Sequence, residues 1–557
     1  MATNKELADL IFPEVKETIK DLEKRFPKRT LKEGAEVTRF APSPTGFLHT
    51  GSLFTALIAY RFAKQSGGVY MFRLEDTDQK REIAGTGLDL VNQLANFQIK
   101  SDEGYFGDHE EGIYGPYVQS KRAEIYKVCI KELIKKGRAY PDFCSKEELD
   151  QIREVQTANK VVPGYYGEYA KYRSLSVDEY IDLIKKGTPY VIRFKSKGNA
   201  ANHIKAHDEI RGDMELTENY QDIVIYKSDG LPTYHFAHLV DDHFMGTTLV
   251  TRGEEWISSL PIHLELFATM GWEAPKYAHL PVIMVNDVET GNKRKLSKRK
   301  DPEAAVSYFL QEGYPKEGVI RYLLTIANSN FEAWMMENPK TDINEFKLSF
   351  DKFSLDGALF DVPKLNNISK ELLANMDKTT FTTQCLEWAK LYDKKFASVI
   401  SSNRDYFESI INIEREQEKP RKDYEKFSEV YPKVAFFYND EYDNILSKGP
   451  LPFNEFISHD VIKAVLEDFI NSWNIDNQDE TIWFNDMKEL GVRHNFSNDR
   501  KEYKKNPTSY NGWYADCISI IRIAICGSTQ SPKLFDVLKL LGKEESQRRV
   551  SKVISSL

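Results

Sequence analysis

The chain has 557 residues, of which 41% are hydrophobic and 29% are charged, and its formal net charge is −9. This length exceeds what one hydrophobic core usually organises, so we expect several domains. The acidic total argues against a surface covered with nucleic-acid-binding lysines, although basic runs at 131–138 and 293–300 can still form a local basic groove.

The cysteines and the apolar runs bear on the compartment. The five cysteines are Cys129, Cys144, Cys385, Cys517 and Cys526. They form no CxxC pair, which indicates a reducing environment. Residues 1–10 lack the basic and apolar regions of a signal peptide, and the apolar run 518–525 is too short to span a bilayer. We therefore expect a cytoplasmic protein that does not associate with a membrane.

The first elements predict helices and then a βαβ unit. Apolar residues recur every three or four positions over 6–26, which is typical of amphipathic helices, and Pro13 marks a break. A strand precedes the prolines of "EVTRFAPSP", a helix covers 52–68, and a second strand begins at 69 and leads into the carboxylates of "EDTD". Strand, helix and strand in this order predict a parallel sheet, whose ligands bind beyond the carboxyl ends of the strands.

The rest of the chain changes character twice. Residues 115–185 are more helical, and β-rich segments follow them. The α/β pattern returns over 235–290, with a helix at 257–272 and a strand at "HLPVIMV", 279–285. After residue 300 the pattern is helical nearly to the end. We expect an α/β domain with a parallel sheet, split by an insertion and followed by an all-α half.

The stretch "RFAPSPTGFLHTG" resembles a phosphate-binding P-loop only in part. Gly46 and Gly51 have a P-loop's spacing, but the lysine of such a loop is absent. A helix starting near Ser52 would direct free N–H groups towards a phosphate, and His49 could donate a hydrogen bond to it. The alternative is a structural turn with a satisfied histidine, and this stretch alone leaves both open.

Three other segments have a chemical and a structural interpretation. Lys295 and Lys298 of "KLSKR" could close over phosphates, or belong to a basic surface loop. The carboxylates of "RLEDTD", 73–78, could bind an ammonium group or a metal, or be solvated. A histidine-rich segment at 234–246 contains His235, His238, Asp241, Asp242 and His243. For this last segment we favour no metal site, because no further ligand is implied.

The order of these motifs is more specific than any one of them. "RFAPSPTGFLHTG", "EDTD", "RGEEW" at 252–256 and "KLSKRK" together closely resemble the bacterial-type glutamyl-tRNA synthetases, which are class I aminoacyl-tRNA synthetases. "FLHTG" is similar to the His-Ile-Gly-His signature of that class, and "KLSKR" to its Lys-Met-Ser-Lys-Ser signature. The resemblance covers 37–365 with high specificity, whereas 366–557 match weakly, through "RIAICG" and "LLGKEESQRR".

The resemblance implies an α/β Rossmann-type catalytic domain split by an α+β insertion, then an all-α C-terminal half. The domains it implies are a helical N-terminal appendage (1–35), the first half of the Rossmann catalytic domain (36–114), an acceptor-stem-binding insertion (115–234), the second Rossmann half (235–290), a stem-contact helical domain with the KLSKR loop (291–365) and an α-helical anticodon-binding region (366–557).

The resemblance also implies an activity. Members of the family activate L-glutamate with ATP and Mg²⁺, and transfer it from glutamyl-adenylate to the 3′-terminal adenosine of tRNA-Glu. Whether tRNA-Gln is also a substrate stays open, and we expect a monomer. The implied catalytic residues are His49, Lys295 and Lys298. The implied ATP-binding residues are Thr45, His49, Gly51, Glu255, Trp256, Lys295, Ser297 and Lys298. The implied glutamate-binding residues are Arg39, Ala41, Ser43, Glu75, Tyr234, His238 and Arg252.

Two positions depart from the family pattern. Many relatives carry asparagine where this chain has His238. Some bacterial members hold a zinc ion in the insertion, but here only Cys144 remains, and Asp142 stands where a second cysteine is expected. We therefore predict no zinc and no other resident metal.

Four other functions are weighed against this one. Glutaminyl-tRNA synthetase typically reads "PEPNG" where this chain has "PSPTG", and it ends in β-barrels. The truncated relative that glutamylates a modified tRNA base lacks the C-terminal half. A small-molecule nucleotidyltransferase does not need this length, and a non-catalytic RNA-binding relative should have lost His49 or Lys298.

Overall fold

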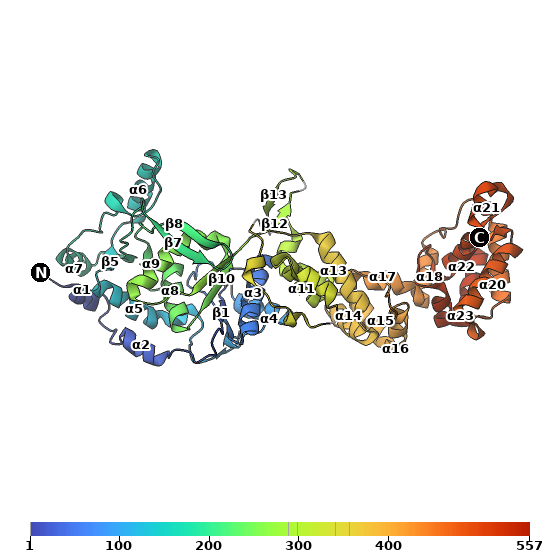
Figure 1. Cartoon of the computed structure of the whole chain (residues 1–557), viewed down its shortest axis with the longest axis horizontal. Helices are drawn as coiled ribbons and strands as arrows, with labels where there is room; N and C mark the ends of the chain where they lie inside the picture. Colours follow the sequence, from blue (N-terminus) through green and yellow to red (C-terminus); the bar gives the residue numbers. More distant parts are fainter. Residues whose placement is uncertain (1, 288, 298, 340, 356) are drawn as a thin grey trace. The chain divides into compact units, whose positions relative to one another are not determined.

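The computed structural model (Figure 1) describes residues 2–287, 289–297, 299–339, 341–355 and 357–557. Lys298, one of the predicted catalytic residues, lies outside the described residues. The chain divides into two compact units, which are described separately. Unit 1 comprises Met1–Tyr308 and Ile320–Asp361, and unit 2 comprises Phe309–Val319 and Val362–Leu557.

The predicted βαβ unit is confirmed. It consists of β1 (Val37–Phe40), α3 (Thr50–Ser66) and β2 (Val69–Phe72). The two strands pair in parallel from Val37↔Val69 to Phe40↔Phe72. Helix α3 begins two residues earlier than expected and ends at Gly67, whose left-handed backbone (φ 68°) favours glycine. The sheet continues through α4 (Thr86–Asn96), β3 (Glu103–Tyr105) and β4 (Glu110–Glu111), in the order β1-β2-β3-β4.

A second parallel pair lies later in the chain. Its elements are α8 (Tyr234–Phe244), β10 (Leu249–Gly253), the 3₁₀ turn Glu254–Ser259, α9 (Leu260–Met270) and β11 (Lys276–Leu280). The backbone N–H of Thr248 donates to the Val37 carbonyl at 2.9 Å, which places the start of β10 beside β1. The carboxyl ends of these strands surround the candidate site.

The prediction of one strand over 279–285 is wrong. Strand β11 ends at Leu280, and β12 (Ile283–Asn286) belongs to a different sheet with β13 (Lys293–Lys295) and β14 (Ala358–Leu359). Pro281 separates β11 from β12, and proline has no N–H to donate to a strand ladder. The run 279–285 therefore contributes residues to strands of two different sheets.

Residues 115–233 combine helices with antiparallel strands. Their elements are the 3₁₀ turn Gln119–Arg122, α5 (Ala123–Lys135), β5 (Ala139–Asp142), α6 (Lys146–Ala158), the 3₁₀ turn Gly167–Tyr169, α7 (Val177–Lys185), β6 (Val191–Phe194), β7 (His203–Asp208), β8 (Gly212–Thr217) and β9 (Val224–Tyr226). Strands β5, β6 and β9 form one antiparallel sheet, and β7 and β8 form a hairpin.

The N-terminal helices share the core of unit 1. The predicted break near Pro13 is confirmed, because α1 (Asn4–Ile11) and α2 (Ile19–Arg25) lie on either side of it. Leu7 and Leu22 are buried in the same hydrophobic cluster as residues of α5 and α8. The buried Lys131 ammonium of α5 donates to the carbonyls of Phe12 and Val15, each at 2.9 Å. Helices α1 and α2 are thus integrated into this core.

The chain passes between the units within α10 (Val306–Glu312) and α11 (Lys316–Ala327). The remaining elements of unit 1 are the 3₁₀ turn Pro302–Ala304, α12 (Phe331–Glu337), and the 3₁₀ turns Ile343–Glu345 and Phe350–Lys352. Phe350 stacks on Phe62 of α3 with ring centroids 3.8 Å apart, which fixes this segment against the βαβ unit.

The described part of unit 2 is helical apart from one short parallel pair, β15 (Phe496–Ser497) and β16 (Gly512–Trp513). Its helices are α13 (Val362–Asn375), α14 (Lys378–Tyr392), α15 (Lys394–Ser402), α16 (Arg404–Asn412), α17 (Val430–Val434), α18 (Asn439–Ser447), α19 (His459–Asn471), α20 (Glu480–Arg493), α21 (Arg500–Lys505), α22 (Tyr514–Cys526) and α23 (Leu534–Ser556). Its 3₁₀ turns are Phe427–Glu429, Ala435–Phe437, Ile475–Asn477 and Pro507–Ser509.

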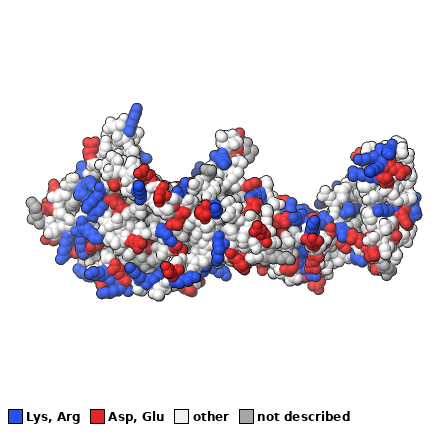
Figure 2. Space-filling model, in the orientation of Figure 1, with Lys and Arg blue, Asp and Glu red and all other residues white. Residues whose placement is uncertain are grey.

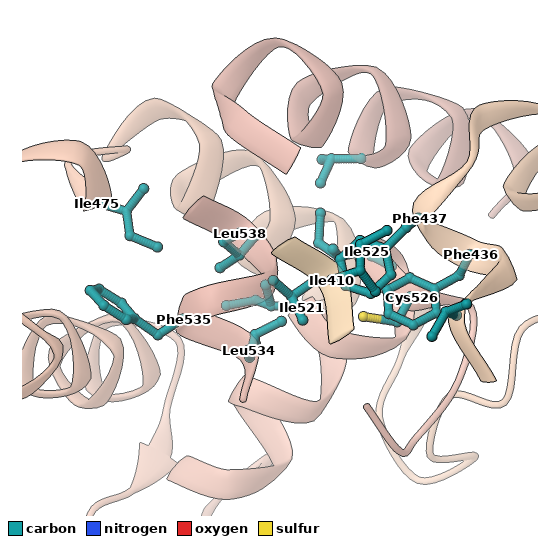
Figure 3. Close-up of a cluster of buried hydrophobic side chains, with 14 of the residues drawn as sticks. Ile410, Phe436, Phe437, Ile475, Ile521, Ile525, Cys526, Leu534, Phe535 and Leu538 are labelled. Atoms are coloured by element: carbon teal, nitrogen blue, oxygen red, sulfur yellow. The ribbon is translucent and has the colours of Figure 1, made fainter. Parts of the chain in front are cut away.

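A hydrophobic cluster holds the helices of unit 2 together. Figure 3 shows Ile521 and Ile525 of α22 packed with Leu538 of α23 and Phe437, and all four are buried. Across the described residues of both units, no helix has the length and apolar character needed to cross a membrane.

Candidate active site

A cavity of about 1160 Å³ in unit 1 gathers most of the residues predicted from the sequence. Those that line it are Arg39, Ala41, Ser43, Thr45, His49, Gly51, Glu75, Tyr234, Arg252, Glu255, Trp256 and Lys295. They come from β1 and the loop after it, the start of α3, the segment after β2, the start of α8, β10 and the segment after it, and β13. His238 and Ser297, which are both described, lie outside this lining.

His49 caps the helix that opens on the cavity. Its backbone is extended, and its Nδ1 accepts a hydrogen bond from the N–H of Gly51 at 3.0 Å. A neutral imidazole that accepts at Nδ1 carries its proton on Nε2, so Nε2 is a donor. A Cβ at Gly51 would lie 3.3 Å from Nδ1, a tight contact that would require the imidazole to shift. The sequence left two roles open for His49, a satisfied histidine in a structural turn or a hydrogen-bond donor to a phosphate. The structure allows both, because Nδ1 caps the helix while the proton lies on Nε2.

Ion pairs of Arg294 anchor the start of the KLSKR segment. Arg294 Nε donates to Asp287 at 2.6 Å, and its terminal nitrogens donate to Asp301 at 2.6 and 2.7 Å. The hydrogen bond from Arg294, with others from the backbone, lowers the pKa of Asp287 to about 2. Ser297 N–H donates to Asp301 at 2.8 Å. Lys295 therefore extends from an anchored hairpin to the cavity wall.

Arg39 is fixed from behind by a buried carboxylate. Its Nε donates to both oxygens of Asp242 at 3.2 Å. Arg73 donates to Asp242 at 2.6 Å and to Glu75 at 2.9 Å. Burial acts to raise the pKa of Asp242, but the two guanidinium groups hold it well below its usual range. For Glu75 burial raises the pKa, and the charges of Arg73 and Arg39 offset this effect only in part.

Arg252 is fixed by two imidazoles and a carbonyl. It donates to His279 Nε2 and His263 Nδ1, each at 3.0 Å, and to the Trp256 carbonyl at 3.3 Å. The Tyr234 ring lies 4.4 Å from that of Trp256. Two oriented arginines, one buried carboxylate and a tyrosine can together bind a molecule with two carboxylates and an ammonium group.

His238 lies behind the cavity wall. It is fully buried, its Nε2 is 2.9 Å from the Tyr277 hydroxyl, and its Nδ1 is 2.6 Å from Asp242. Burial lowers the pKa of His238 to about 4, so the ring is neutral at pH 7. Its position gives it a supporting contact with the carboxylate that holds Arg39.

Sequence reasoning missed the residues that hold the arginines. Asp242 was considered only as a metal ligand, and His263 and His279 were not identified. The register that pairs Arg252 with His279 is not visible in a local pattern. Among the described residues, no three or more His, Cys, Asp or Glu side chains are placed to hold a metal ion.

Comparisons with known proteins identify the family. Residues 36–348 match the family described as "tRNA synthetases class I (E and Q), catalytic domain", and residues 514–554 match "Anticodon binding domain". A glutamate–tRNA ligase of Clostridium beijerinckii is 46% identical over 550 residues, covering 99% of each chain. One of Acetivibrio thermocellus is 44% identical over 551 residues, covering 99% of this chain and all of that relative.

Solved structures give the same assignment. The crystal structure of a glutamate tRNA ligase from Elizabethkingia meningosepticum, in complex with its amino acid, matches with a TM-score of 0.70 and 28% identity, over 94% of this chain and all of that one. The glutamate-tRNA synthetase from Elizabethkingia anophelis matches with a TM-score of 0.72 at the same identity and coverage. The chain therefore belongs to the glutamate–tRNA ligases, a family of class I aminoacyl-tRNA synthetases.

Proposed function

We propose that this chain activates L-glutamate with ATP and esterifies it to the 3′-terminal adenosine of tRNA-Glu. The observation that carries the proposal is a single cavity lined by a helix-capping histidine, Lys295 and two oriented arginines. A glutamate α-carboxylate oxygen attacks the α-phosphorus of ATP, the bond to the bridging oxygen breaks, and pyrophosphate leaves. A ribose hydroxyl of the tRNA then attacks the acyl carbon, AMP leaves, and the hydroxyl proton passes to the departing phosphate.

The phosphates belong at the start of α3. His49 Nε2–H and the free N–H groups of that helix start donate to phosphoryl oxygens. Lys295, together with Lys298 outside the described residues, neutralises the charge that builds on pyrophosphate. Thr45, Gly51, Glu255, Trp256 and Ser297 complete the proposed ATP site. ATP enters as its magnesium complex, and Mg²⁺ supplies further positive charge at the phosphates.

Glutamate belongs at the buried end of the cavity. Arg39 and Arg252 bind its two carboxylates, and Glu75 binds the ammonium group. Ala41, Ser43 and Tyr234 complete the proposed pocket, with His238 supporting it from behind. Glutamine is disfavoured because its amide N–H groups would face the donors of an arginine.

The tRNA contacts are proposed by region. Residues 115–234 form an α+β insertion that binds the acceptor stem, and they interrupt a Rossmann-type domain made of 36–114 and 235–290. Residues 291–365 contact the stem, and the all-α region 366–557 reads the anticodon. The match of 514–554 to an anticodon-binding family supports the last assignment. Figure 2 shows lysines and arginines gathered at α21, where Arg500, Lys501, Lys504 and Lys505 are exposed.

The chain is proposed to act as a cytoplasmic monomer. Its five cysteines are all unpaired, and four of them are buried. Thiols that stay free fit a reducing compartment.

Aminoacylation of tRNA-Glu and tRNA-Gln, measured side by side, tests the proposal. We expect glutamate-dependent ATP–pyrophosphate exchange and glutamylation of tRNA-Glu, and the assay on tRNA-Gln decides whether that tRNA is a second substrate. Exchange with glutamine in place of glutamate would instead identify a glutaminyl-tRNA synthetase. No exchange with either amino acid, with or without tRNA, would indicate a non-catalytic RNA-binding relative.

A further inference from the structure

A chain of buried groups outside the proposed glutamate pocket ends on Arg252. We propose that Asp208 and His279 on one side, and His263 on the other, are positioning residues that fix the Arg252 guanidinium for a substrate carboxylate. This inference rests on the proposed function, because it requires Arg252 to bind glutamate. It adds three residues that do not touch the substrate.

The sheet register brings Arg252 and His279 together. They are direct partners in the parallel pairing of β10 and β11, so their side chains lie on the same face of the sheet. Arg252 Nε donates to His279 Nε2 at 3.0 Å. A guanidinium has no acceptor, so His279 Nε2 must be unprotonated and its proton must lie on Nδ1.

Asp208 fixes that tautomer. It is fully buried at the end of β7, and its Oδ2 accepts from His279 Nδ1 at 2.6 Å and from the His279 backbone N–H at 3.0 Å. Its Oδ1 accepts from the N–H groups of Ile210 and Arg211, each at 3.0 Å. With four donors on its two oxygens, the carboxylate is held by the hairpin turn and in turn holds the imidazole.

The other side of Arg252 is built in the same way. Its NH1 donates to His263 Nδ1 at 3.0 Å, which puts the His263 proton on Nε2, and Nε2 lies 3.0 Å from His235 Nδ1. Burial lowers the pKa values of both His263 and His279, so both rings stay neutral and can accept from a cation.

The consequence is a guanidinium with one orientation. Contacts to His279, His263 and the Trp256 carbonyl use three of its five N–H groups. Each terminal nitrogen carries a second N–H, which can donate to a substrate carboxylate. Because the orientation of the Arg252 guanidinium is set before binding, the binding of glutamate does not include the entropy cost of ordering this side chain. Losing an acceptor should therefore weaken glutamate binding and leave ATP binding unchanged.

The test compares two substitutions at one position. H279F keeps an aromatic ring without an acceptor, whereas H279Q restores a carbonyl acceptor for Arg252 and an N–H donor for Asp208. In ATP–pyrophosphate exchange with tRNA-Glu present, H279F should raise the KM for glutamate about 10–100-fold, the range for losing a hydrogen bond to a charged group. The KM for ATP should change less than about twofold, and H279Q should recover most of the loss.

The control is H109Q, since His109 is exposed and contacts only Asp108, Glu111 and Phe106 in the described structure. Its kinetic constants should be those of the unmodified chain. An unchanged KM for glutamate in H279F, or equal rises in both KM values, would overturn the inference. Absence of glutamate-dependent exchange in the unmodified chain would instead refute the proposed function.

A measurement on the unmodified chain covers the case in which H279F does not fold. Nitrogen-15 NMR of histidine-labelled protein at pH 7 should show His279 neutral with its proton on Nδ1, and His263 neutral with its proton on Nε2. A doubly protonated ring, or the opposite tautomer, at either position would overturn the assignment.

Discussion

The Thr50 hydroxyl donates to the backbone carbonyl of Glu303 at 2.6 Å, which ties the start of α3 to the segment that follows KLSKR. An isolated antiparallel bridge between His49 and Ala305 lies beside this bond, and the Val306 N–H donates to the Leu48 carbonyl at 3.2 Å. Two motifs about 250 residues apart in the sequence are therefore joined by backbone contacts. These contacts place Lys295 and His49 around the same cavity.

Replacing Thr50 with valine should slow activation by weakening this tie. Thr50 is buried, and valine has its shape but no hydroxyl, so only the hydrogen bond to Glu303 is lost. We expect kcat for pyrophosphate exchange to fall about 3–10-fold, as for a net contribution near 1 kcal/mol from one hydrogen bond. T269V is the matched control, because within the described part of the chain the Thr269 hydroxyl bonds only inside α9, to the Glu265 carbonyl. Equal rates for T50V and T269V would contradict the role of the tie.

Substitutions at His49 should separate its two roles. Alanine removes both the helix cap and the Nε2 donor, whereas asparagine is a good capping residue that lacks the imidazole. We expect glutamate activation to fall about 10²–10³-fold in both variants, as is typical of losing one transition-state donor. Stability should fall by about 1 kcal/mol in H49A only. Near-normal exchange in H49N would show that His49 acts only as a cap.

A buried ion pair lies where the family pattern led us to expect a second cysteine. Arg193 Nε donates to Asp142 at 2.5 Å, the Tyr165 hydroxyl donates to it at 2.7 Å, and Cys144 Sγ lies 3.5 Å from that hydroxyl. Asp142 is 1% exposed, so D142A removes the buried carboxylate that accepts from Arg193 and from the Tyr165 hydroxyl. Loss of one partner of a buried pair costs about 3–5 kcal/mol.

Calorimetry resolves the unfolding transitions of a multidomain chain. It should show a loss of stability in D142A and no loss in D150N, because Asp150 is an exposed residue of α6. Metal analysis of the unmodified protein should find no stoichiometric zinc. One zinc per chain, or an unchanged transition in D142A, would refute the assignment of a purely ionic cluster.

Stability should fall between pH 7 and pH 4 because of one buried and two half-buried histidines. Burial lowers the pKa values of His235, His238 and His243 to about 4, against 6.5 in the unfolded chain. Between these values the unfolded state binds more protons, so stability is complete above about pH 7 and is lost as the pH falls. Each histidine contributes a slope of about 1.4 kcal/mol per pH unit.

Thermal unfolding from pH 7.5 to pH 5 checks this dependence. H243F should reduce the pH dependence of the unfolding free energy by about one bound proton, because it removes one titrating imidazole. Phenylalanine keeps the stacking on Trp272, whose ring centroid lies 3.8 Å from that of His243. H203Q should leave the slope unchanged, because His203 is an exposed residue at the start of β7. A transition temperature that does not vary over this range would contradict the shifted pKa values.

Patterns within short stretches of the sequence predicted those parts of the site that depend on neighbouring residues alone. The spacing of apolar residues and glycines predicted the βαβ unit and placed His49 at a helix start to within two residues. It failed at "HLPVIMV", because Pro281 divides an apolar run whose periodicity is the same on both sides. The partners of Arg39 and Arg252 depend on pairings between distant segments, so nothing near those arginines in the sequence indicates Asp242 or His279.

The burial of α1 and α2 has a consequence for synthesis of the chain. Leu7 and Leu22 pack in one core with Ile130 of α5 and Phe236 of α8, more than 100 and 200 residues later. At translation rates of about 5–20 residues per second, α5 is completed roughly 6–25 s after α1. During that interval α5 and α8 have not been synthesised, so the apolar faces of α1 and α2 cannot yet be buried as they are in the folded chain.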